Sequence, residues 1–185
     1  MWINETTDGL NRSEAEDLKS IEEAEKAQLA HNAVSATIVA KHPIQQDLLK
    51  RDVEFNKEKV NEQKQELEML IGHLEKAQKD HQESIHNASK LHHFMHDADE
   101  LNELIDQKLK IAAELDARDL SNIPQKVHQN ANLRNDIAAN QNRVSALQED
   151  AVDLVGNPEV DETLQGIEEK WDKLQTVVHE KGKVM

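Results

Sequence analysis

Long helices are predicted by one property of this sequence: between Pro43 and Pro124 it contains no proline and a single glycine, Gly72. Proline and glycine are the residues that most readily end a helix, and ordinary globular helices are far shorter than this stretch. The stretch therefore predicts one long helix, or several long helices joined end to end.

The composition favours helices that share narrow apolar seams. Of the 185 residues, 37% are hydrophobic and 32% are charged, whereas only 2% are aromatic. Alternating apolar and polar stretches of the kind that mark strands are missing from the sequence. This profile is typical of coiled coils and elongated bundles, so we expect an all-α fold. The scarcity of aromatic lining argues against an enzyme pocket.

The charge and the cysteine content limit the possible partners and locations. The formal net charge is −15 and there is no cysteine. An acidic chain without a basic stripe is a poor ligand for nucleic acid or anionic lipid. No apolar run approaches the roughly 20 residues that span a bilayer. We therefore expect a cytoplasmic protein that neither inserts into membranes nor binds nucleic acid.

The central stretch carries an apolar seam that changes face. Its first part has two polar members and runs through Leu67, Ile71, Leu74, Gln78, His81, Ile85 and Ala88. Consecutive steps of three then lead from Ala88 to Leu91 and Phe94, which rotates the seam around the helix. The second part runs through Phe94, Ala98, Leu101, Ile105, Leu109 and Ala112. We predict a turn near residues 54–57 and one helix over about 58–115 that serves two cores.

Two further helices are expected after this one. Ser121 is a suitable N-cap, and Pro124 falls in the first turn of a helix over about 122–154. The expected seam of that helix is Val127, Ala131, Ile137, Val144, Leu147, Ala151 and Leu154. Gly156-Asn157-Pro158 predicts a stop and a turn. The last helix has the seam Val160, Leu164, Ile167, Trp171, Leu174 and Val178, and the three helices should pack as an up-down-up bundle.

The beginning of the chain repeats this plan with weaker signals. At an offset of about 99 to 102 residues, Ile44 corresponds to Val144 and Trp2 to Leu104. The counterpart of Phe94 would precede the first residue, so we expect a first unit that starts partway into its first helix, in a fragment of a longer array.

Two local features of this first unit carry their own expectations. Ser13 and Glu16 resemble a capping box that would begin the second helix early, at about residue 14. Pro43 lies inside that helix and predicts either a kink or a break.

Three segments resemble the spectrin repeat. Phe94-Met95-His96-Asp97-Ala98-Asp99-Glu100-Leu101 is similar to the opening of a repeat, and Ile137-Ala138-Ala139-Asn140-Gln141-Asn142-Arg143-Val144 to its second helix. The third segment is Ile167-Glu168-Glu169-Lys170-Trp171-Asp172-Lys173-Leu174, in which Trp171 stands where the family has its third-helix tryptophan. The family's first-helix tryptophan is Leu104 here, although Trp2 retains it in the first unit, and Ile71 replaces the third-helix tryptophan there.

The resemblance implies a fold and a domain organisation. The fold would be all-α, with two tandem left-handed three-helix coiled-coil bundles (spectrin repeats) joined by a continuous helix. Residues 1–90 would form a divergent repeat with a truncated first helix, and residues 91–185 a second repeat.

The resemblance also implies a function. The chain would be a monomeric rod segment, a spacer and protein-docking scaffold in a spectrin-like actin cross-linking or membrane-skeleton protein at the cell cortex. Two alternatives remain open: an adaptor-binding module, such as an ankyrin-binding pair of β-spectrin repeats, and a dimeric coiled-coil oligomerisation rod. Partners would be cytoskeletal proteins, with ankyrin or another spectrin-type chain as candidates.

One histidine cluster has a spacing that is compatible with a metal site. His92 and His96 are four residues apart, near His93, Asp97 and Asp99, a spacing that can hold a divalent ion. Two histidines fill only half of a tetrahedral site, so we expect polar surface side chains here and no metal site. No catalytic constellation or cofactor motif is recognisable, which predicts a protein that is not an enzyme. The residues do not assign a partner-binding surface.

Overall fold

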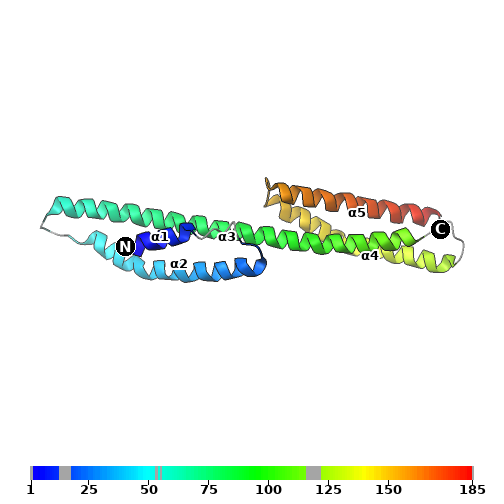
Figure 1. Cartoon of the computed structure of the whole chain (residues 1–185), viewed down its shortest axis with the longest axis horizontal. Coiled ribbons are helices and arrows are strands. Elements are labelled where there is room, and N and C mark those ends of the chain that lie inside the picture. Colours follow the sequence, from blue (N-terminus) through cyan, green and yellow to red (C-terminus); the bar gives the residue numbers. More distant parts are fainter. Residues whose placement is uncertain (1, 13–17, 53, 55, 116–121, 185) are drawn as a thin grey trace. The chain divides into compact units, whose positions relative to one another are not determined.

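A computed structural model describes residues 2–12, 18–52, 54, 56–115 and 122–184. These residues form five helices and no strand: α1 (Trp2–Arg12), α2 (Ile21–Lys50), α3 (Lys57–Glu114), α4 (Ile123–Val152) and α5 (Pro158–Val184) (Figure 1). The expected all-α bundle fold is confirmed. The chain divides into two compact units, Met1–Ser89 and Lys90–Met185, and α3 runs through the division without interruption.

The long helix lies close to its expected position. We predicted a helix over about 58–115, and α3 spans Lys57–Glu114. The preceding helix ends at Lys50, a few residues before the predicted turn at 54–57. Asn56 closes this connection in the left-handed conformation with φ of 54°, a conformation that asparagine tolerates better than most residues.

The expected early start of the second helix is wrong. Ser13 and Glu16 lie outside the described residues, but Leu18 to Ser20 are not helical and α2 begins at Ile21. The start is set by Ser20, whose Oγ accepts a hydrogen bond from the Glu23 backbone N–H at 3.2 Å. The Glu23 carboxylate in turn accepts from the Lys19 backbone N–H at 2.8 Å. These reciprocal bonds satisfy donors that the first turn leaves unpaired.

Pro43 does not break α2. The helix continues through it from Ile21 to Lys50, and the proline side chain is exposed. Proline supplies no N–H for the carbonyl four residues earlier, and its ring crowds the preceding turn. The helix tolerates this defect at a position outside the core.

The second unit has a large apolar core. Phe94, Ala98, Leu101, Ile105 and Ala112 of α3 are all at most 1% exposed, as the predicted seam requires. From α5, Val160, Ile167, Trp171, Leu174 and Val178 are also buried. The indole N–H of Trp171 donates to Gln141 Oε1 at 3.2 Å, so its polar atom has a partner inside the bundle.

The predicted seam of α4 is wrong in its first two turns. Val127 is 46% exposed and Ala131 is exposed, whereas Asn130 and Leu133 are 4% and 2% exposed. Steps of four and three counted back from Val144 pass through positions 137, 133 and 130, which places Val127 and Ala131 outside the interface. Val127 and Ala131 suggested the wrong inward face for α4 because they are apolar. The buried position is instead occupied by a polar residue, Asn130.

The ends of the helices in the second unit are fixed by local contacts. Gly156 has a φ of 93°, and the Asn157 side chain accepts from the Glu159 backbone N–H at 3.0 Å, which confirms the predicted stop and turn before α5. Pro124 lies in the first turn of α4 as expected. Ser121, the predicted N-cap, lies outside the described residues; Asn122 precedes the helix and makes no capping bond with its side chain.

A lysine from α5 covers the carboxyl end of α3. The Lys181 ammonium donates to the carbonyl oxygens of Leu115 at 2.6 Å, of Ala113 at 3.2 Å, and also of Ala112. Carbonyls at a helix end have no partner within the helix and carry partial negative charge. One cation therefore satisfies several of them.

The first unit has a much smaller core. Its buried apolar cluster is Leu10, Ile38, Leu74 and Ala77, with Trp2, Ile3 and Val34 packed against it. The expected equivalence of Ile44 and Val144 fails, because Ile44 is 59% exposed and the buried position is occupied by Gln45. The Trp2 ring is half-buried, and the Lys41 ammonium lies 4.9 Å from its centre.

Candidate functional site

Polar side chains occupy the interface between α2 and α3 in the first unit. The buried residues of α2 recur at intervals of seven: Ala24, His31, Ile38 and Gln45. A seven-residue interval returns to the same helix face, so this is the face that packs inward. Half of its members are polar, in a position where bundles usually place leucine or isoleucine. We call the residues that pair across this interface the polar seam: Gln28, His31, Ser35, Gln78, His81 and Gln82.

The polar seam consists of three side-chain pairs. Gln28 and Gln82 exchange reciprocal amide hydrogen bonds of 2.9 and 2.8 Å. Gln78 donates to Ser35 Oγ at 2.9 Å. Between these pairs, His31 and His81 face each other with their Nδ1 atoms 2.9 Å apart. Each pair joins one residue of α2 to one of α3, so the interface is held by polar contacts along several turns.

The histidine pair lies on the inward side of both helices, where the charged form of each imidazole is disfavoured. His31 is 4% exposed, and the two ring centres lie 5.1 Å apart. Burial lowers the pKa of both imidazoles, and the neighbouring His31 lowers the pKa of His81 further. Since two Nδ1–H groups cannot point at each other, one Nδ1 must donate and the other accept. Nε2 of His81 is buried without a hydrogen-bond partner among the described residues.

An open cavity lies beside the histidine pair. It has a volume of about 450 Å³ and is bounded by α1, α2 and the two imidazoles. Its lining is mostly apolar and comprises Trp2, Glu5, Thr6, Gly9, Leu10, Ala27, Ala30, His31, Val34, Thr37 and His81. Glu5 of α1 is the acidic residue of this lining. The cavity therefore adjoins the two imidazoles and is otherwise mostly apolar.

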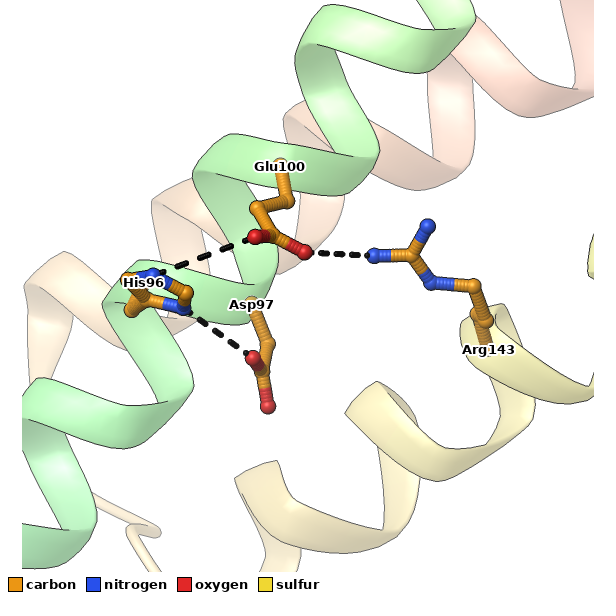
Figure 2. Close-up of polar contacts among 4 residues, drawn as sticks. All are labelled: His96, Asp97, Glu100 and Arg143. Carbon is orange, nitrogen blue, oxygen red and sulfur yellow. Dashed lines mark hydrogen bonds and ion pairs between the residues drawn. The ribbon is translucent and has the colours of Figure 1, made fainter.

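For the histidine cluster near residue 92 we expect polar surface side chains, and His96 and Asp97 are exposed. His96 Nδ1 lies 3.3 Å from Asp97 Oδ1, and His96 Nε2 lies 3.9 Å from Glu100 Oε1 (Figure 2). Glu100 also accepts a hydrogen bond from Arg143 of α4 at 3.0 Å. His96, Asp97 and Glu100 are the three residues whose ligand atoms lie within 4.8 Å of one another, and all three are exposed. His92 is not one of the three.

The chemistry of this exposed cluster is that of an ion-pair network. Arg143 already neutralises one oxygen of Glu100, and His96 lies beside two carboxylates (Figure 2). Exposed groups of this kind are strongly hydrated and contribute little to stability. The arrangement links α3 to α4 at the surface of the second unit.

The sequence identified His81 as a polar member of a seam but did not identify its partner. His31, Gln28 and Ser35 look like ordinary surface residues when read one at a time. The seven-residue spacing of Ala24, His31, Ile38 and Gln45 is the signal that would have located the inward face of α2.

Comparison with protein families identifies the second unit. The family model of the spectrin repeat matches residues 89–184, more than half of the chain. A search of curated protein sequences gave no match. The spectrin repeat is a structural, non-enzymatic module that mediates contacts between proteins. Within the described residues, no helix is both long and apolar enough for a membrane crossing.

Proposed function

The chain belongs to the spectrin repeat family, and we propose that it is a spacer and protein-docking scaffold of a cytoskeletal protein at the cell cortex. In this proposal, the first unit is a second, divergent repeat. The observation that carries the proposal is α3, which contributes to both compact units without an interruption at Ser89. A helix common to two bundles links their stabilities, which suits a segment that bears load.

Several features of the first unit support its assignment as a repeat. It contains three helical segments, and its inward face on α2 has the seven-residue interval of a coiled coil. Trp2 and Leu104, which correspond in the expected alignment, are both half-buried and packed against their respective cores.

The coupling is tested by breaking the common helix. Ser89→Pro removes a backbone donor and crowds the preceding turn in the helix interior. We expect the native chain to unfold in one coupled step under force or denaturant, and the Ser89→Pro chain to unfold in two. Ser89→Ala, which keeps the helix, is the matched control. Two independent steps in the native chain would contradict the proposed load-bearing role.

The alternative of a dimeric coiled coil predicts a different molecular mass in solution. In the second unit the apolar seams of α3, α4 and α5 are buried against one another within one chain. In such a monomer, α3, α4 and α5 have no long apolar seam left with which to bind a second chain. Sedimentation equilibrium should therefore give a concentration-independent mass near 21.1 kDa. A mass that doubles with concentration would favour the oligomerisation rod.

Docking is supported by apolar side chains that α2 exposes. Leu29, Val39 and Ile44 are 70%, 68% and 59% exposed. The acidic chain, with its formal net charge of −15, favours a protein partner whose contact surface combines apolar and basic residues. Ankyrin and other spectrin-type chains are the candidates to titrate. Leu29→Lys should weaken binding at this surface, whereas Met69→Lys, which changes an exposed residue of α3, should not.

A further inference from the structure

The arrangement of His31 and His81 goes beyond a spacer function. We propose that these two imidazoles form a binding site for a divalent transition-metal ion of the zinc type, reached through the adjoining cavity. Imidazole nitrogen is a preferred ligand for Zn²⁺, Cu²⁺, Ni²⁺ and Co²⁺, and a poor one for Mg²⁺ or Ca²⁺.

The two nitrogens are close to the separation that a common ion requires. Zinc–nitrogen bonds of about 2.0–2.1 Å at a tetrahedral angle place two ligand nitrogens about 3.3 Å apart. The Nδ1 atoms of His31 and His81 are 2.9 Å apart, so they need to move apart by only a few tenths of an ångström to bind the ion. The ring planes are inclined at 42° to each other, so the two imidazoles are not stacked face to face.

The protonation state also suits a metal. Both imidazoles are kept neutral by burial, and a neutral ring has a lone pair to donate. Without a metal, one Nδ1 must carry a proton that the other accepts. On binding, that proton moves to Nε2 of the same ring, so both Nδ1 lone pairs face the ion and no net proton is released.

The pair is costly as a packing element. In either tautomer, Nε2 of His81 is a buried polar atom without a partner among the described residues. Two leucine-sized residues would fill the same interface without that cost. The imidazoles therefore contribute something other than cohesion to this interface.

The surroundings hold the pair in place. The Gln28–Gln82 and Ser35–Gln78 pairs lie on either side of it and join the same two helices. Preorganised neighbours of this kind are what a metal site needs to keep its geometry. Solvent entering through the adjoining cavity would fill the remaining positions of the ion.

Cobalt and zinc titrations of the full chain test the site. Co²⁺ at a tetrahedral nitrogen and oxygen site gives an intense visible absorption, so we expect one equivalent of Co²⁺ to develop that band and Zn²⁺ to displace it. His31→Gln and His81→Gln should each weaken binding by about tenfold or more, since even outer-shell changes at metal sites cost about that much. His96→Gln, which alters the exposed cluster, is the matched control and should bind as the native chain does.

A second measurement covers the case in which a variant does not fold. In the native chain, ring-nitrogen NMR resonances of His31 and His81 should shift together on addition of one equivalent of Zn²⁺, and those of His96 should not. Binding that is retained in both His31→Gln and His81→Gln would overturn the proposal. So would binding lost in His96→Gln, or a zinc-induced shift confined to the other histidines.

Discussion

The side-chain amide of Asn130 on α4 donates a hydrogen bond to the backbone carbonyl oxygen of Val178 on α5, 3.0 Å away. Asn130 is 4% exposed, so the bond is made inside the core of the second unit. It places a polar residue at a heptad position where the helix would otherwise present an apolar one.

Removing this hydrogen bond should destabilise the second unit. Asn130→Ala deletes the donor and leaves a small void, so we expect a loss of about 1–3 kcal/mol in the free energy of unfolding. Asn132→Ala changes an exposed asparagine of the same helix and should cost less than about 0.5 kcal/mol. Chemical denaturation followed by Trp171 fluorescence measures both. Equal effects would show that the buried bond is not stabilising.

Glycine replacement should have opposite signs at two positions. Gly72 lies in the interior of α3, and an added methyl group there meets no atom within 4 Å. Gly72→Ala should therefore stabilise the first unit by about 0.5–1 kcal/mol through helix propensity. Gly156→Ala should destabilise the second unit by about 1 kcal/mol, because φ at Gly156 is 93°. Thermal unfolding of the two variants gives the comparison.

The two units should differ in stability once they are uncoupled. Among the residues that the structure describes, the buried apolar cluster of the first unit comprises Leu10, Ile38, Leu74 and Ala77, and that of the second is much larger. In the Ser89→Pro chain, Trp2 reports on the first unit and Trp171 on the second, using variants in which the other tryptophan is phenylalanine. We expect the Trp2 transition at the lower denaturant concentration. The reverse order would mean that the polar seam is more stabilising than apolar packing.

Acidification should destabilise the first unit. His31 and His81 have pKa values below the ordinary 6.5, because burial disfavours the charged form. The unfolded chain therefore takes up protons first as the pH falls through 6.5, and the free energy of unfolding decreases from there toward the folded-state pKa values. Above pH 6.5 both states are neutral at these residues and the effect disappears.

The pH effect is measured on the metal-free chain with a chelator present. Denaturation midpoints reported by Trp2 at about pH 7.5 and 5.5 should differ in the native chain and in His96→Gln. The double variant His31→Gln/His81→Gln should lose most of the difference. A midpoint that is higher at pH 5.5 would contradict the assigned direction of the pKa shifts.

The parts of the fold that could be predicted are those in which apolar spacing and chain breakers agree. The bounds of α3 and the buried positions Phe94 to Ala112 follow from an apolar heptad in a stretch that has no proline and only one glycine, Gly72. The start of α5 follows from Gly156-Asn157-Pro158. In each case local propensity and tertiary burial favour the same structure.

The rest could not be predicted because polar residues stand at buried positions. Because Asn130 is polar, the apolar pattern did not identify the inward face of α4. His31 and Gln45 had the same effect on the inward face of α2. A pairing such as His31 with His81 joins positions 50 apart in the sequence, which no local pattern specifies. The spacing of His92 and His96 is compatible with a metal ion but does not specify the contacts of His96, which lies beside Asp97 and Glu100.

The polar seam also determines which alignments of α2 and α3 are allowed. Apolar heptads tolerate a slip of seven residues, because one leucine replaces another. Here a slip of that size would place His31 against Leu74 or Ala88 instead of His81, and would separate Gln28 from Gln82. Such a slip would bury the imidazole of His31 without its histidine partner. The polar seam therefore fixes the register of α2 and α3, although it packs less favourably than an apolar interface would.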